Sequence, residues 1–149
     1  MNFRSLVEKQ RNYFEQGNTR NLEFRISMLR KLQSAIRSNE SIFCEAIKKD
    51  MNKCPTEVYM TEIGMVLEEL SFHIRHLSSW LRNKKVHTPI AQFPAKSFIS
   101  PEPYGVALIM SPWNYPIQLC LLPLIGAISA GCTAVVKPSA YAPATSHAI

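Results

Sequence analysis

Two short segments of the sequence combine side chains that suit catalysis or ligand binding. The first is Ser111-Pro-Trp-Asn-Tyr-Pro116, which follows the apolar run Val106–Met110, and the second is Lys137-Pro-Ser139, which follows Thr133–Val136. An amide such as that of Asn114 can both donate and accept hydrogen bonds. A lysine can bind hydroxyl or phosphate groups. Both segments are therefore candidate functional sites.

The apolar runs that precede these segments are typical of strands buried in a parallel sheet. Between them, residues 114–130 predict a helix with Pro116 near its first turn and Gly131 at its C-terminal stop. The result is one right-handed βαβ unit, and the carboxyl ends of its strands form the edge where open α/β sheets bind ligands. Taken alone, Asn114 is more simply explained as the N-cap of this helix, and Lys137 as a solvated residue.

The N-terminal half of the chain carries helical periodicity. Apolar side chains recur three and four residues apart over residues 2–16, 22–36, 42–47 and about 56–82. Gly17 is placed to end the first helix, and Thr19 or Asn21 to cap the second. Ser38 and Asn39 interrupt the second stretch, and Pro55 suits the first position of the last helix. The sequence therefore predicts helices packed before the sheet begins.

Prolines separate this helical half from the sheet. Residues 86–103 predict a proline-broken linker with one short strand, Ser97–Ser100. We therefore expect an N-terminal helical segment over residues 1–85, the linker, and the start of an α/β domain over residues 104–149. A two-stranded parallel sheet leaves its faces and edges uncovered, so we expect the chain to be the N-terminal piece of a longer protein.

The formal net charge of +6 is concentrated in the helical half, where ten of the 17 lysines and arginines lie in residues 1–50. Such a balance can indicate nucleic-acid binding. Glutamates are interspersed through the same helices, however, and mixed signs on amphipathic helices usually mark a solvated face. These acids are Glu8, Glu15, Glu23, Glu40, Glu45, Glu57, Glu62, Glu68 and Glu69. We expect no nucleic-acid partner.

Residues 103–136 contain no charged side chain, so a membrane span is the other interpretation to weigh. Helix-breaking residues punctuate the run, among them Pro112, Pro116, Pro123, Gly126 and Gly131. Its ends are also patterned as strand, helix and strand. A buried α/β core explains the run better, and we expect no membrane span.

Four cysteines, Cys44, Cys54, Cys120 and Cys132, occur without a CxxC pair, which argues against a zinc or dithiol site. Free thiols and the lack of a secretory signal fit a cytoplasmic protein. None of the four is assigned as a nucleophile, and Cys120 and Cys132 are expected to pack in the core. His73 and His76 stand three apart on a predicted helix without a third ligand nearby, so packing histidines are favoured over a metal pair.

Three segments, Pro112-Trp-Asn-Tyr-Pro116, Gly126-Ala-Ile-Ser-Ala-Gly131 and Val136-Lys-Pro-Ser139, resemble the aldehyde dehydrogenase superfamily in their order and spacing. The chain looks most similar to the class 3-like branch, which acts on fatty and aromatic aldehydes. The resemblance covers essentially the whole chain. It implies an α/β fold in which N-terminal helices lead into the first βαβ unit of a Rossmann-like parallel sheet, here incomplete, so that residues 104–149 are the start of a dinucleotide-binding domain.

The resemblance also implies roles for individual residues. Asn114 would donate its side-chain amide to the aldehyde oxygen, which becomes an oxyanion after thiolate attack, and Tyr115 would face the aldehyde tunnel. Lys137 would hydrogen-bond the adenosine ribose of NAD or NADP. Many relatives carry Glu where this chain has Ala140, and the missing carboxylate implies that NADP is accepted. The residues expected to line the dinucleotide are Met110, Ser111, Pro112 and Trp113.

The reaction that the resemblance implies is oxidation of an aldehyde to a carboxylic acid through a cysteine thiohemiacetal. The catalytic Cys and Glu of the family lie downstream of the segments found here, so the chain alone is expected to be inactive. The full-length protein is expected to be a homodimer. The alternative from another class is a non-enzymatic helical module that contacts a protein partner or a membrane.

Overall fold

Helices form the first half of the chain, and strands enter only after residue 83. The computed structural model describes residues 2–149. The first half contains α1 (Phe3–Glu15), α2 (Leu22–Ser38), α3 (Glu40–Met51), α4 (Pro55–Val58), the π-helical turn η1 (Tyr59–Ile63) and α5 (Gly64–Trp80). The second half contains β1 (Lys84–Val86), the 3₁₀ turn η2 (Ile90–Gln92), β2 (Ser97–Ile99), β3 (Val106–Met110), α6 (Gln118–Ala130), β4 (Thr133–Lys137) and α7 (Pro143–Ala148).

The helix ends follow the capping residues of the sequence. Asn21 caps α2 through its Oδ1, which accepts a hydrogen bond from the Phe24 N–H at 3.0 Å. Gly17 takes the left-handed conformation (φ 77°) just after α1, and Gly131 does so (φ 88°) after α6. Asn39 separates α2 from α3, as predicted, but its amide turns back to the Ala35 carbonyl at 2.8 Å instead of capping α3.

The long helix predicted over 56–82 is present as α4, η1 and α5, which follow one another without a break from residue 55 to residue 80. The five residues of η1 form a π-helical turn within it. A π turn widens the helix locally and shifts which side chains face the core, and such turns are frequent at functional sites. Periodicity alone predicted the helix but not this irregularity.

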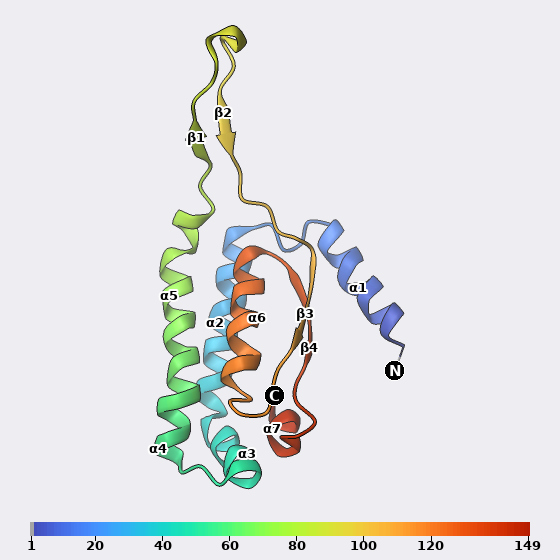
Figure 1. Ribbon diagram of the computed structural model, residues 1–149, viewed down its shortest axis with the longest axis vertical. Coiled ribbons are helices and arrows are strands. Elements are labelled where there is room, and N and C mark those ends of the chain that lie inside the picture. Colours follow the sequence, from blue (N-terminus) through green and yellow to red (C-terminus); the bar gives the residue numbers. More distant parts are fainter. Residues whose placement is uncertain (1) are drawn as a thin grey trace.

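An antiparallel two-stranded arm, residues 84–99, projects away from the helices (Figure 1). The predicted strand is confirmed as β2 and ends at Ile99 instead of Ser100. Its partner β1 was not predicted, and residues 84 and 85, assigned from the sequence to the helical segment, belong to it. The sequence missed β1 because two of its three residues are lysines, so it has no apolar alternation.

The predicted βαβ unit is confirmed. Strands β3 and β4 pair in parallel, with Val106 opposite Thr133 and Met110 opposite Lys137. Helix α6 contacts the sheet from one side and α1 from the other, so the sheet lies between them (Figure 1). No helix in residues 2–149 combines the length and apolar character needed to cross a bilayer.

The main core lies where α2, α5 and α6 pack against one another, and α3 and η1 contribute to it. Burial of these apolar side chains joins the N-terminal helices to the βαβ unit, so the two halves share one hydrophobic cluster. Its fully buried members include Leu29, Ile36, Ile47, Ile63, Leu70, Leu77, Ile117 and Ile125. The helical half therefore packs directly against α6, the helix that connects the two strands of the parallel sheet.

Candidate functional site

The parallel register brings the two candidate segments to the same edge of the sheet. Met110 is the register partner of Lys137, and the Ser111 N–H donates to the Lys137 carbonyl at 3.2 Å. Ser111 itself is buried, so its side chain belongs to the fold rather than to the exposed edge. Residues 111–117 and the turn after β4 therefore start side by side.

Lys137 and Ala140 both lie on the exposed side of this edge. The Lys137 ammonium lies 3.3 Å from the carbonyl of its own neighbour Pro138. Ala140 stands in the turn between β4 and α7, three residues further on. An exposed ammonium such as that of Lys137 can bind anionic or hydroxyl-bearing ligands.

The loop between β3 and α6 is longer than the sequence predicted. Helix α6 begins at Gln118, so the expectation that Asn114 begins the helix is wrong. Asn114 sits in a bend, and Ile117 occupies the N-cap position without a side-chain cap of its own. Trp113, Asn114 and Tyr115 are exposed, whereas Pro116 and Ile117 are buried. The loop thus presents its three central side chains outward and anchors its C-terminal end in the core.

A buried carboxylate anchors that end. Glu62 of η1 is 0% exposed, and its Oε2 accepts a hydrogen bond from the Ile117 N–H at 2.9 Å. Its other oxygen, Oε1, forms an ion pair with Lys53 Nζ at 3.0 Å. The sequence interpretation that placed Glu62 on a solvated face is therefore wrong. A carboxylate so deeply buried requires such partners, because it has lost its hydration.

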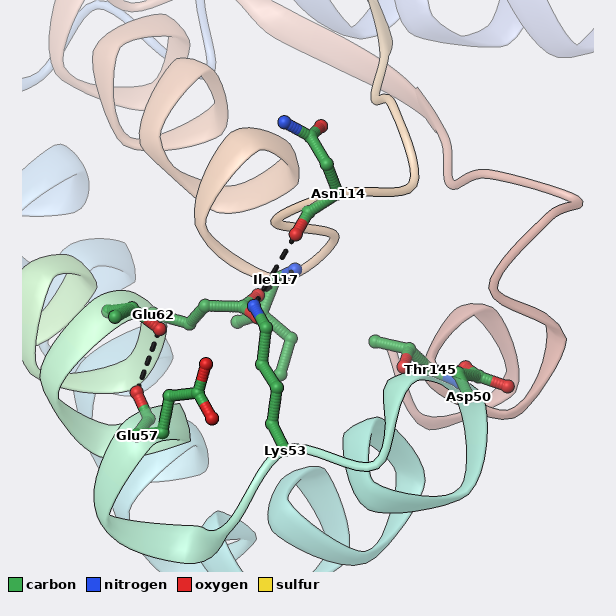
Figure 2. A network of polar contacts seen from close by, with 8 residues as sticks. Asp50, Lys53, Glu57, Glu62, Asn114, Ile117 and Thr145 are labelled. Carbon is green, nitrogen blue, oxygen red and sulfur yellow. Dashed lines mark hydrogen bonds and ion pairs between the residues drawn. The ribbon is translucent and has the colours of Figure 1, made fainter.

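Lys53, in the connection between α3 and α4, contacts the same loop twice. Its Nζ lies 3.4 Å from the Asn114 carbonyl oxygen and 4.2 Å from the centroid of the Tyr115 ring. The second contact is a cation–π interaction. In Figure 2 the Asn114 carbonyl points toward Lys53, whereas its side-chain amide points away from the charged pair. The backbone of Asn114 is held, and its amide is presented outward.

Asp50, at the end of α3, caps the first turn of α7 across the fold (Figure 2). Its carboxylate accepts the Ala144 N–H at 3.1 Å, the Thr145 N–H at 2.7 Å and the Thr145 hydroxyl at 2.8 Å. Burial alone would raise the pKa of Asp50, but these hydrogen bonds from Thr145 and Ala144 outweigh it and hold the pKa below its ordinary value. Asp50 therefore fixes the segment that follows β4.

Both ring nitrogens of His73 have hydrogen-bond partners. Its Nδ1 lies 2.7 Å from the Ser129 hydroxyl and its Nε2 lies 3.0 Å from the Glu69 carboxylate. Within residues 2–149, no three His, Cys, Asp or Glu side chains gather in a metal-binding arrangement.

The cysteines of the chain are free, and two have thiols that burial makes less acidic. Burial raises the pKa of Cys120, which lies in the core on α6, and also that of Cys44. A raised pKa lowers the thiolate fraction at neutral pH, and the thiolate is the nucleophile. Cys120 therefore has the surroundings of a packing thiol, as the sequence predicted.

The sequence reasoning missed Lys53, Glu62 and Asp50 as parts of this edge. For Glu62 a signal existed, because it stands four residues before Val66 and eight before Leu70, on the buried stripe of the long helix. A charge on an apolar stripe is a candidate for a buried pair. No pattern in the sequence singled out Lys53, which lies in a connection without periodicity.

Comparison with known proteins gives a consistent result. The profile of the aldehyde dehydrogenase family matches residues 1–149. The chain is 44% identical over 137 residues to the 4,4'-diaponeurosporen-aldehyde dehydrogenase of Staphylococcus aureus, with 92% of this chain and 30% of that protein covered. It is 39% identical over 143 residues to the mouse aldehyde dehydrogenase family 3 member B1, with 96% of this chain and 31% of that protein covered.

Solved structures show the same likeness. The substrate-bound Staphylococcus aureus AldH superimposes with a TM-score of 0.95 at 42% identity, over 99% of this chain and 32% of that chain. Pseudomonas syringae AldA, an indole-3-acetaldehyde dehydrogenase in complex with NAD+ and IAA, superimposes with a TM-score of 0.81 at 26% identity, over 93% of this chain and 28% of that one. The chain spans about a third or less of the length of these proteins. Nothing in these comparisons supports the alternative of a non-enzymatic module.

Proposed function

The chain belongs to the aldehyde dehydrogenase family, and from this premise we propose that the whole protein oxidises aldehydes to carboxylic acids with a nicotinamide dinucleotide. The observation that carries the proposal is the placement of Asn114, whose backbone is held at the carboxyl edge of the sheet while its amide is presented outward. This is the arrangement that a fixed donor to a reacting oxygen requires.

In this proposal the Asn114 amide donates a hydrogen bond to the aldehyde oxygen as that oxygen becomes negative. A donor that is fixed before the reaction needs no reorganisation during it, and loss of one such donor costs about 10²–10³ in rate. In this proposal the nucleophilic thiol and the general base come from outside these 149 residues, as the family resemblance implies, and the raised pKa values of the Cys44 and Cys120 thiols agree with this for those two cysteines. The 149-residue chain alone therefore binds no aldehyde productively and turns none over.

The edge formed by β3 and β4 fits a nicotinamide dinucleotide in its chemistry. Lys137 offers an exposed ammonium for ribose hydroxyls or phosphate, and Trp113 offers an exposed flat ring. Met110, Ser111, Pro112 and Trp113 line the dinucleotide in this proposal, in part through their backbone, because Ser111 is buried. The nicotinamide supplies the hydride acceptor for the oxidation. The complex of AldA with NAD+ supports a nicotinamide dinucleotide as the cofactor.

We propose that the protein uses NADP as well as NAD. Ala140 is exposed beside this edge and has no carboxylate to repel a 2′-phosphate, whereas the Lys137 cation lies three residues before it. Removal of a like-charge contact relaxes discrimination between the two dinucleotides.

The substrate class in this proposal is apolar aldehydes, fatty or aromatic. Tyr115 lines the aldehyde tunnel in this proposal. Its ring is partly exposed, and the Lys53 ammonium lies over the ring. The name of the Staphylococcus aureus relative, a 4,4'-diaponeurosporen-aldehyde dehydrogenase, supports an apolar substrate.

The whole protein is a cytoplasmic homodimer in this proposal. The arm exposes apolar side chains near its tip, with Ile90 91% and Phe93 86% exposed. Exposed apolar surface of this kind marks an interaction site, and a second copy of the chain is its proposed partner. The four free cysteines suit the reducing conditions of the cytoplasm.

The proposal is tested with the purified whole protein, hexanal or benzaldehyde, and NAD or NADP, with formation of the reduced dinucleotide followed by absorbance. We expect turnover with at least one pair, and none with the 149-residue chain alone. Turnover by the 149-residue chain would contradict the assignment of the nucleophile to another part of the protein. A whole protein inactive with both aldehydes and both dinucleotides would contradict the proposed function.

A further inference from the structure

Lys53 and Glu62 have no role in the proposed chemistry, yet together they hold the loop that carries it. Lys53 contacts the Asn114 carbonyl and the Tyr115 ring, and Glu62 accepts the Ile117 N–H (Figure 2). The two side chains are joined to each other at 3.0 Å. Three points of the loop are therefore tied to one ion pair that comes from the helical half of the chain.

The loop needs such ties because the strand hydrogen bonds end at Ser111 and the helical ones begin at the Tyr115 carbonyl, which accepts the Leu119 N–H at 2.9 Å. Asn114 lies in a bend between a strand and a helix, where neither element's hydrogen-bond pattern fixes the backbone. Both ties lie on the C-terminal side of the Asn114 side chain, at its own carbonyl and at Ile117, and on the N-terminal side the Ser111 N–H donates to the Lys137 carbonyl at 3.2 Å. Hydrogen bonds are directional, so together they fix the orientation of the backbone between them.

Stability alone is a poor explanation for this pair. Burying a carboxylate and an ammonium carries a large desolvation cost, and apolar residues of similar volume often stabilise a fold equally well or better. The pair is better explained by the backbone geometry that it imposes on the loop, because a buried, hydrogen-bonded charge tolerates few alternative arrangements. The π turn η1, which carries Glu62, is a further departure from regular packing at the same place.

We propose that Lys53 and Glu62 are positioning residues, which fix loop 111–117 so that the Asn114 amide points at the reacting oxygen of the aldehyde. This rests on the proposed function, because it assigns Asn114 the role of oxyanion donor. Neither residue touches the substrate in this proposal. Both act through Asn114, and their effect on the rate therefore disappears when the Asn114 amide is absent.

The test is a double-mutant cycle on the whole protein with hexanal. Lys53→Met combined with Glu62→Gln removes both charges together, so that no lone charge is left buried, and the glutamine keeps an acceptor for the Ile117 N–H. This pair is introduced into the parent and into Asn114→Ala. Lys49→Met combined with Glu68→Gln, two exposed residues on α3 and α5, is the matched control. Circular dichroism and the thermal midpoint establish that each variant is folded.

We expect the Lys53–Glu62 variant to lower kcat by about 10-fold or more in the parent, because a small displacement of a catalytic group is costly. In Asn114→Ala we expect it to lower kcat by less than about 2-fold, since coupled residues are not additive. The KM for the dinucleotide and the activity of the control stay within about 3-fold, because neither Lys53 nor Glu62 contacts a residue assigned to the dinucleotide site. Lys53→Arg keeps the positive charge, so we expect this single variant to retain part of the kcat that the Lys53–Glu62 variant loses.

An equal loss of kcat in the parent and in Asn114→Ala would overturn the positioning role and assign the pair to general folding. An unchanged kcat in the parent would also overturn the positioning role. If Asn114→Ala itself keeps kcat within about 3-fold, the proposed function fails first, and the inference falls with it. Should the double variant not fold, Glu62→Gln alone is tested in the same cycle, because it keeps an acceptor for the Ile117 N–H and leaves without its partner only Lys53, whose side chain is 13% exposed and still contacts the Asn114 carbonyl.

Discussion

The Glu62 carboxylate accepts the backbone N–H of Ile117 at 2.9 Å, across 55 positions of sequence. Through this bond a residue of the helical half satisfies an N–H at the start of α6, where Ile117 has no side chain able to cap the helix. The helices before the sheet are therefore part of the site at its edge, although they contribute none of its exposed side chains.

Loss of the Glu62 carboxylate should destabilise the protein. Glu62→Ala leaves the Lys53 ammonium without its partner and the Ile117 N–H without its acceptor, so we expect the free energy of unfolding to fall by about 3 kcal/mol. Glu62→Gln should cost less, since it retains an acceptor. Urea unfolding of the whole protein measures both, with Glu68→Ala on the exposed face of α5 as the control. A loss no larger than that of Glu68→Ala would show that the ion pair adds nothing.

Asp50 should make stability depend on pH in the acidic range. Its pKa is depressed below the ordinary 3.8, so its contribution is complete above that value and is lost as the pH falls through the lower pKa of the folded state. The Asp50 carboxylate accepts three hydrogen bonds from α7, and Asp50→Asn replaces it with a neutral amide that has one acceptor oxygen. We expect this substitution to lower the free energy of unfolding by about 1–2 kcal/mol at neutral pH.

The same substitution should have a smaller effect in acid. We expect the stability difference between parent and Asp50→Asn to narrow below about pH 4, because protonation weakens the acceptor in the parent too. Thermal midpoints of both proteins over a pH series measure this difference. A gap that stays constant into acid would mean that the Asp50 carboxylate is not responsible.

Ala140→Glu should shift the preference between the two dinucleotides toward NAD. A carboxylate at this exposed position would accept hydrogen bonds from ribose hydroxyls and repel a 2′-phosphate, although solvent weakens the repulsion. We expect the ratio of kcat/KM for NADP to that for NAD to fall by about 10-fold. Ala35→Glu, at an exposed position of α2, is the matched control. An unchanged ratio would show that Ala140 is not a determinant.

The 149-residue chain by itself should self-associate. Its parallel sheet has only the strands β3 and β4, and Leu108 and Met110 on one face are 63% and 69% exposed. Apolar faces and free strand edges promote association. Light scattering over a concentration series should show growing assemblies. A sharp, reversible thermal transition independent of concentration would contradict this expectation.

Much of the fold follows from patterns that the sequence displays openly. Apolar periodicity predicted the helices, and the runs before Ser111 and Lys137 predicted the parallel strands and their shared edge. These features depend on local spacing and on burial, which a single sequence records. Strand β1 does not, because its pairing with β2 is decided by the partner strand rather than by its own residues.

The residues of the candidate site likewise divide into those that the sequence could identify and those that it could not. Asn114 stood out because of the residues beside it, but it lies in a bend rather than at a helix start, and its carbonyl is contacted by Lys53, 61 residues earlier in the sequence. Glu62 was misjudged because counting charges ignores which stripe of a helix a charge lies on. Long-range pairs such as Lys53 with the Asn114 carbonyl leave no periodic trace, so only the folded chain reveals them.

The role of Asn114 is tested most directly by the kcat of Asn114→Ala in the whole protein, measured with hexanal at saturating dinucleotide. We expect a fall of about 10²–10³-fold with the fold intact, because the variant removes a fixed donor to the oxyanion. Asn12→Ala, an exposed asparagine on α1, should leave kcat unchanged. A kcat for Asn114→Ala within about 3-fold of the parent would contradict the proposed role of this amide.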